Sequence, residues 1–209
     1  MTRLILLPLL LSVLVSCASK PTGSYAPPQS QDLERTTITI RTPFDQVWDN
    51  LIAYAADSFF SIQHYEKDSG LIVLTFGDNN IENFITGGQF QRTAYTGLSA
   101  RGWGEHPAFS GDWVSLLEHD YNAALNGTLN VVVQPRGGGT QVTVKARYTL
   151  QFDTGDHESG WSLRDDRYTL KLETGTCIDW LNPKPTGQTP SKRTVCPTYR
   201  VERAIFENL

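Results

Sequence analysis

The sequence predicts an α+β domain in which an antiparallel β-sheet is covered by two helices. Three observations indicate this fold class. Residues 127–152 alternate apolar and polar side chains on both sides of a Gly-rich turn, as in an antiparallel hairpin with one buried face. Apolar residues at spacings of three and four predict one helix at 43–56 and another at 197–209. The order is therefore strand, helix, several strands, helix, and the two helices are available to cover the sheet.

The first elements of the domain follow from local signals. A strand is expected at 36–41, where apolar and polar residues alternate. Thr42 and Pro43 are then expected to start the first helix, as its N-cap and its first helical residue. Two strands, at 59–67 and 71–76, should form a hairpin around a Gly-containing turn.

The middle of the chain has a weaker pattern. Residues 77–126 are rich in Gly, Asn and Ser, and we expect irregular strands in a long excursion from the sheet. A short helix is expected near 80–85. A further strand is expected within 113–124, because a long loop without secondary structure is uncommon in a small domain. After the central hairpin, alternation at 168–172 predicts one more strand.

Three aromatic residues of this middle segment stand among glycines: Trp103, Phe109 and Trp113. They have two interpretations. Either they are core residues that the chain reaches by an irregular path, or they line a contact surface, where aromatic residues are enriched.

The first sixteen residues have the features of an export signal. Arg3 is the only charged residue before Lys20, and residues 4–15 are almost wholly apolar. This run is too short for a membrane-spanning helix, which needs roughly 20 apolar residues.

The four residues that end this signal, Leu-Val-Ser-Cys at 14–17, resemble the lipobox of bacterial lipoproteins. The resemblance implies cleavage before Cys17, which would then carry a diacylglycerol and an N-acyl chain such as palmitate. Several acyl chains together hold a protein on a membrane almost permanently. The alternative is an ordinary signal with a chance cysteine at its boundary. Ala18 is not the Asp that marks inner-membrane retention, so the resemblance favours the outer membrane, with the domain facing the periplasm.

Cleavage would leave residues 17–209, which is enough for one domain and a tether. Residues 17–35 are rich in Ser, Pro, Gln and Gly and predict a flexible tether, and residues 36–209 predict a single α+β domain. The shortened chain has 17 Lys and Arg against 22 Asp and Glu, a formal charge of −5. It has no basic cluster, and nucleic acid is therefore not an expected partner.

The two other cysteines, Cys177 and Cys196, are expected to form a disulfide in an oxidising compartment. The bridge would close a ring of 20 residues, from 177 to 196, and would stabilise the fold by about 3 kcal/mol. A metal site would need further ligands, and none stands near either cysteine in the sequence.

The sequence contains no strong catalytic, nucleotide or metal motif, and we predict neither an enzyme nor a cofactor. A set of five titratable residues remains as an alternative site. It could bind a metal or act in acid–base chemistry if the middle segment folds back on itself. Its members are Glu105, His106, Glu118, His119 and Asp120.

A family resemblance rests on five packing patterns, at residues 42–48, 60–62, 69–73, 129–133 and 142–148. The first three are similar to the helix-grip domains of BamC-type outer-membrane lipoproteins, and the last two resemble strands of related lipoproteins. The resemblance covers 36–76 and 127–209. It implies a non-enzymatic envelope lipoprotein, a membrane-tethered protein-interaction module with an accessory or assembly role. Helix-grip sheets can also enclose an apolar cavity, so a periplasmic binding module for a lipid or other apolar ligand is the alternative.

Overall fold

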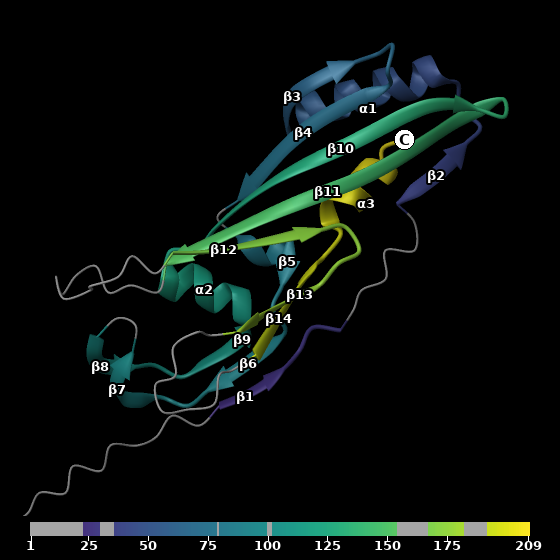
Figure 1. The fold of residues 1–209 in the computed structure, drawn as a ribbon. Coiled ribbons are helices and arrows are strands. Elements are labelled where there is room, and N and C mark those ends of the chain that lie inside the picture. Colours follow the sequence, from purple (N-terminus) through teal and green to yellow (C-terminus); the bar gives the residue numbers. More distant parts are fainter. Residues whose placement is uncertain (1–22, 30–35, 79, 100–101, 154–166, 182–191) are drawn as a thin grey trace, which may run out of the picture.

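The computed structural model describes residues 23–29, 36–78, 80–99, 102–153, 167–181 and 192–209 (Figure 1). Strands make up 54 % of the structure, and they pair in antiparallel sheets. The described residues form three short α-helices: α1 (Phe44–Asp57), α2 (Trp113–Tyr121) and α3 (Arg200–Phe206). The predicted α+β, helix-grip-like fold, a sheet covered by two helices, is therefore wrong. The domain is β-rich, because segments that were expected to be irregular form small sheets of their own.

The largest sheet contains six strands in the order β12-β11-β10-β4-β3, with β2 also paired to β11. Their bounds are β2 (Thr37–Ile40), β3 (Ser61–Glu66), β4 (Leu71–Asp78), β10 (Ala124–Arg136), β11 (Gly139–Asp153) and β12 (Arg167–Glu173). β10 and β11 form the long hairpin that the alternation predicts, with Val131 opposite Val144. Gly137 and Gly138 make its turn with φ of +58° and +83°, a conformation that favours glycine.

The inner face of this sheet contacts all three helices and not two alone: α1, α3 and also α2, whose Trp113 meets Phe152 of β11 edge to face. Helix α1 packs on β3, β10 and β11 through a buried stripe of Val47, Trp48, Leu51 and Ala55, while α3 packs on β11. Pro43 is itself the N-cap of α1, so the expected Thr42 cap does not form. Instead the Thr42 carbonyl accepts a hydrogen bond of 2.7 Å from the Thr140 hydroxyl.

A second region of the molecule consists of three small sheets, with strand orders β1-β6-β9, β13-β14-β5 and β7-β8 (Figure 1). Their bounds are β1 (Gly23–Ala26), β5 (Ile85–Thr86), β6 (Gln89–Arg92), β7 (Tyr95–Ser99), β8 (Gly102–His106), β9 (Phe109–Asp112), β13 (Ile178–Leu181) and β14 (Lys192–Pro197). The short helix expected near 80–85 is one 3₁₀ turn, η1 (Ile81–Asn83).

Helix α2 replaces the strand that was expected within 113–124. The Asp112 carboxylate accepts a hydrogen bond from the Val114 N–H and caps the helix at its start. Asn122 adopts the left-handed conformation, with φ of +47°, and ends it. Local capping therefore decides the structure of a segment that contains several residues typical of strands.

Part of the segment expected to be a flexible tether, residues 17–35, pairs with the domain. Residues 23–26 form strand β1, which pairs with β6 and places Tyr25 opposite Phe90. This strand is stabilised by contacts with residues that are distant in the sequence. Such contacts cannot be predicted from the composition of the segment. Residues 17–22 and 30–35 lie outside the described residues.

Candidate functional site

The outer face of the six-stranded sheet, opposite α1 and α3, presents two cross-strand rows of mostly polar residues. The rows run Thr75-Thr128-Arg147-Glu173 and Gly77-Asn126-Thr149-Lys171, across β4, β10, β11 and β12. We call these eight residues the outer-face rows. Side chains alternate between the two faces of a strand. Because the neighbours of these residues along each strand point into the core, the eight residues themselves face solvent.

A hollow with a volume of about 420 Å³ lies over the outer-face rows. Hydroxyl, amide and charged groups line it together with Phe76, Gly127, Tyr148 and Leu172 of the same strands. Gly127 is required beneath it, since a Cβ atom at this position would lie 2.0 Å from Cζ of Phe76. The Phe76 ring occupies that space on the inner face and meets Tyr148 edge to face, with the ring centroids 5.5 Å apart.

The charge of the outer face is opposite in sign to that of the whole chain, which is −4. Among the described outward-facing side chains of β11 and β12, four are basic and one is acidic: Lys145, Arg147, Arg167, Lys171 and Glu173. Arg147 Nε lies 3.4 Å from the Glu173 carboxylate, but both side chains are about two-thirds exposed (71 % and 68 %). An ion pair this exposed is weak, and both groups remain accessible to a partner. The face can therefore offer cations and hydrogen-bonding groups to an anionic surface.

Beneath this hollow, α3 brings a buried carboxylate to the inner face of the sheet. Glu202 is 0 % exposed, and its two carboxylate oxygens accept hydrogen bonds from the Tyr148 hydroxyl (2.8 Å) and the Thr174 hydroxyl (2.7 Å). Burial, followed by the Glu202 charge, raises the pKa of Tyr148 far above its usual value, so Tyr148 stays a proton donor. This network fastens α3 to Tyr148 of β11 and to Thr174, the residue after β12.

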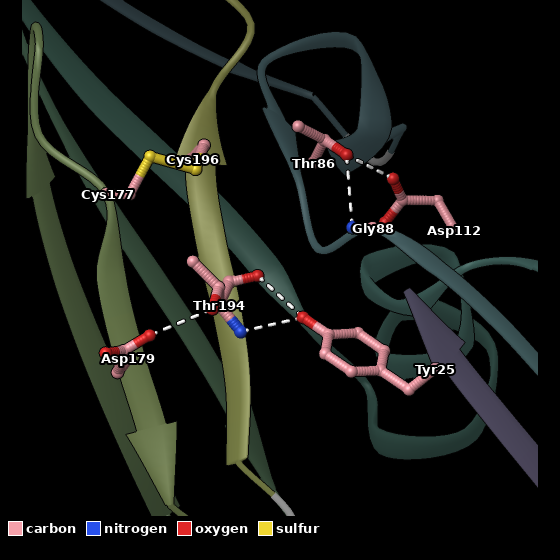
Figure 2. The surroundings of a disulfide bond; sticks show 8 residues. All are labelled: Tyr25, Thr86, Gly88, Asp112, Cys177, Asp179, Thr194 and Cys196. Carbon is pink, nitrogen blue, oxygen red and sulfur yellow. Dashed lines mark hydrogen bonds between the residues drawn. A yellow bond between two sulfur atoms is a disulfide. The ribbon is translucent and has the colours of Figure 1, made fainter. Parts of the chain in front are cut away.

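The predicted disulfide between Cys177 and Cys196 is confirmed, and it joins the segment before β13 to β14 (Figure 2). In β14, Thr194 holds the side chain of Tyr25. The Tyr25 hydroxyl accepts a hydrogen bond from the Thr194 N–H (2.8 Å) and donates one to the Thr194 carbonyl (3.3 Å). The Arg193 guanidinium lies 4.4 Å from the centroid of the Tyr25 ring and 5.2 Å from that of Phe90.

Another polar cluster of the small-sheet region, also in Figure 2, surrounds Asp112. Its carboxylate accepts hydrogen bonds from the Thr86 hydroxyl (2.5 Å), the Gly87 N–H (2.8 Å) and the Val114 N–H (2.9 Å). The Thr86 hydroxyl in turn accepts one from the Gly88 N–H (3.2 Å). The carboxylate thus organises the turn after β5 and the start of α2, which is a structural task.

The aromatic residues singled out in the sequence lie in different surroundings. Trp113 is 5 % exposed and stacks on Trp180 at a centroid distance of 5.3 Å, which fits the core interpretation. Phe109 is half-buried beside Phe90. The side chain of Trp103 lies outside the described part of the structure, as does Cys17, the expected lipidation site. The contact surface expected from these aromatic residues therefore stays a prediction.

The structure separates the titratable residues of the middle segment. His106 lies in β8 and stacks on Tyr95, with 4.5 Å between the ring centroids, whereas Glu118 and His119 lie in α2. A Glu118 oxygen accepts a hydrogen bond of 3.4 Å from the Ile81 N–H. The side chain of Asp120 is outside the described part. Across the described ranges, no three His, Cys, Asp or Glu residues are grouped so that they could hold a metal ion.

No protein-family model, curated protein or solved structure matches this chain. Within the part of the chain that the structure describes, no helix has the length and apolar character needed to cross a membrane.

Proposed function

We propose that this chain is a non-enzymatic cell-envelope lipoprotein, a membrane-tethered protein-interaction module with an accessory or assembly role. Its anchor is the lipid on Cys17, and the outer membrane is its location. The observation that supports a binding role is that no described element packs on the outer face of the six-stranded sheet. That face offers exposed hydroxyl, amide and cationic groups on four adjacent strands.

The charge of this face supports an anionic protein partner. Lys145, Arg147 and Lys171 lie on neighbouring positions of β11 and β12, in a chain that is acidic overall. Such a local reversal of charge attracts acidic surfaces, speeds encounter and orients the partner. The threonine and asparagine side chains of the outer-face rows can then donate and accept hydrogen bonds across the contact.

The alternative, a periplasmic binding module for a lipid or other apolar ligand, needs apolar space between helix and sheet. Side chains occupy that region in the described structure, where the Glu202 network joins α3 to β11. The hollow on the outer face is partly open to solvent, and hydroxyl, amide and charged groups line it beside Phe76, Tyr148 and Leu172. The described packing therefore favours the protein-interaction role.

The anchor is tested by fractionating cells that produce the full chain or its Cys17→Ser variant. The wild-type chain should sediment with outer membranes and carry acyl chains on Cys17 by mass spectrometry. The variant should lose both properties. An unmodified wild-type Cys17 would contradict the anchor.

The contact surface is tested by crosslinking intact cells and identifying the attached proteins. A double charge reversal on the outer face, Lys145→Glu with Lys171→Glu, should remove the main crosslinked partner. The matched control, Lys67→Glu with Arg200→Glu, makes the same change in net charge away from the outer face and should retain the partner. Recovery of the same adducts from both variants would contradict the proposed surface.

A further inference from the structure

Strand β1 fastens the start of the domain to elements that come much later in the chain. It pairs with β6 from Gly23↔Arg92 to Ala26↔Gln89. Its Tyr25 side chain also bonds to the backbone of Thr194 in β14, which is 169 positions further along the chain. The folded domain therefore begins at β1 and not at residue 36.

This attachment shortens the chain between the expected lipid and the folded domain. Gly23 is six residues after Cys17, and a fully extended chain of that length spans at most about 20 Å. A tether that reached residue 36 would span up to about 65 Å. The short connection keeps the part of the domain near Gly23 within about 20 Å of the lipidated residue.

The residues around Gly23 are cationic and aromatic. Arg92 is opposite Gly23 on one side and opposite Phe109 on the other. Its Nε donates a hydrogen bond of 3.3 Å to the Pro107 carbonyl, and its guanidinium lies 5.9 Å from the centroid of the Tyr95 ring. We call Arg92, Tyr95, Pro107 and Phe109 the anchored end. In Figure 1, β1, β7 and β8 all lie toward the end of the molecule opposite the β10–β11 turn.

We infer that β1 fixes the orientation of the domain on the membrane, with the anchored end against the lipid head groups. The inference rests on the proposed lipid at Cys17. An arginine attracts anionic head groups, and tyrosine is enriched at the boundary between head groups and acyl chains. In this orientation the β10–β11 turn, at the other end of the molecule in Figure 1, lies away from the bilayer, and the 13 residues of β10 alone extend about 40 Å.

The experiment uses the full lipidated chain in vesicles of phosphatidylethanolamine and phosphatidylglycerol that carry an acceptor dye on the head groups. A donor dye is attached either at Ala108, beside the anchored end, or at Gln134, near the β10–β11 turn; both residues are exposed. Energy transfer from position 108 should exceed that from position 134 several-fold. Equal transfer from both positions would overturn the inferred orientation.

Two variants test whether β1 is responsible. Tyr25→Ala should bring the two transfer values toward equality by releasing the strand, whereas Tyr65→Ala, at an exposed tyrosine of β3, should leave the difference unchanged. Inserting about ten Gly and Ser residues after Ala18 should also reduce the difference without touching the fold, because the connection lengthens. An undiminished difference after the insertion would show that the short connection does not set the orientation.

The same samples distinguish a failure of the proposed lipid anchor from a failure of the inferred orientation. Mass spectrometry of the purified chain reports the acyl groups on Cys17. A chain without them contradicts both the proposed anchor and this orientation. An acylated chain with equal transfer from both positions contradicts the orientation alone.

Discussion

The hydroxyl of Tyr25 allows the role of β1 to be tested by removing one atom. In Tyr25→Phe the ring stays beside Arg193, but the hydrogen bonds with the N–H and carbonyl of Thr194, at 2.8 Å and 3.3 Å, are lost. Each hydrogen bond of this kind contributes about 0.5–1.5 kcal/mol. We weight the longer one less and expect a loss of about 1–2 kcal/mol in the free energy of unfolding.

This prediction is checked by urea denaturation of the oxidised chain, followed by circular dichroism. Tyr65→Phe is the matched control, because Tyr65 is 59 % exposed on β3, and it should change the free energy of unfolding by less than about 0.5 kcal/mol. Equal midpoints for Tyr25→Phe and Tyr65→Phe would refute the claim that Tyr25 fastens β1 to the domain.

Three further predictions concern packing, pH and the disulfide. Gly127→Ala should destabilise the domain by about 1–3 kcal/mol or more in the same denaturation assay, since the added methyl overlaps the Phe76 ring; a wild-type midpoint would contradict this packing. The pKa of Tyr148 is raised above 10.0 in the folded state, so the unfolded state loses its proton first as the pH rises. The contribution of Tyr148 to stability should therefore be constant below about pH 10.0 and should then fall by about 1.4 kcal/mol per pH unit, so Tyr148→Phe should show a smaller alkaline loss of stability in melting curves. Replacing Cys177 and Cys196 together by serine should cost about 3 kcal/mol, because 19 positions separate them; unchanged stability would contradict this chain-entropy argument.

The elements that the sequence predicts well have a pattern that repeats over many residues. In β10 and β11 the alternation continues on both sides of the Gly-rich turn, and the register Val131↔Val144 follows from which residues are apolar. Helix α1 likewise shows its buried stripe at helical spacing. In both cases the burial of one face determines the local structure, so the sequence is sufficient.

The elements that escaped prediction depend on caps or on distant contacts. Helix α2 contains Trp113 and Val114, which favour strands, although Asp112 and Asn122 provide cap signals at its two ends. Strand β1 has four residues and no apolar alternation, and its main side-chain contact is with Thr194. Short strands of this kind cannot be derived from local composition.

The candidate site was only partly visible in the sequence. Alternation in β11 places Lys145, Arg147 and Thr149 on the solvent side, and this much follows from the pattern. The alignment of Arg147 with Thr128 and Glu173 in one row depends on pairing between three strands. Because register across several strands is a tertiary property, the hollow over these rows could not be predicted.

Photocrosslinking at single positions in intact cells tests the central claim most directly. A photoreactive residue at Thr149, within the outer-face rows, is compared with one at Ala53, which is exposed on α1. The proposed function predicts one dominant adduct with an envelope protein from position 149, and its loss when Lys145 and Lys171 are both replaced by glutamate. Unmodified monomer from position 149, or the same adducts from both positions, would contradict the proposal that this sheet face is the contact surface.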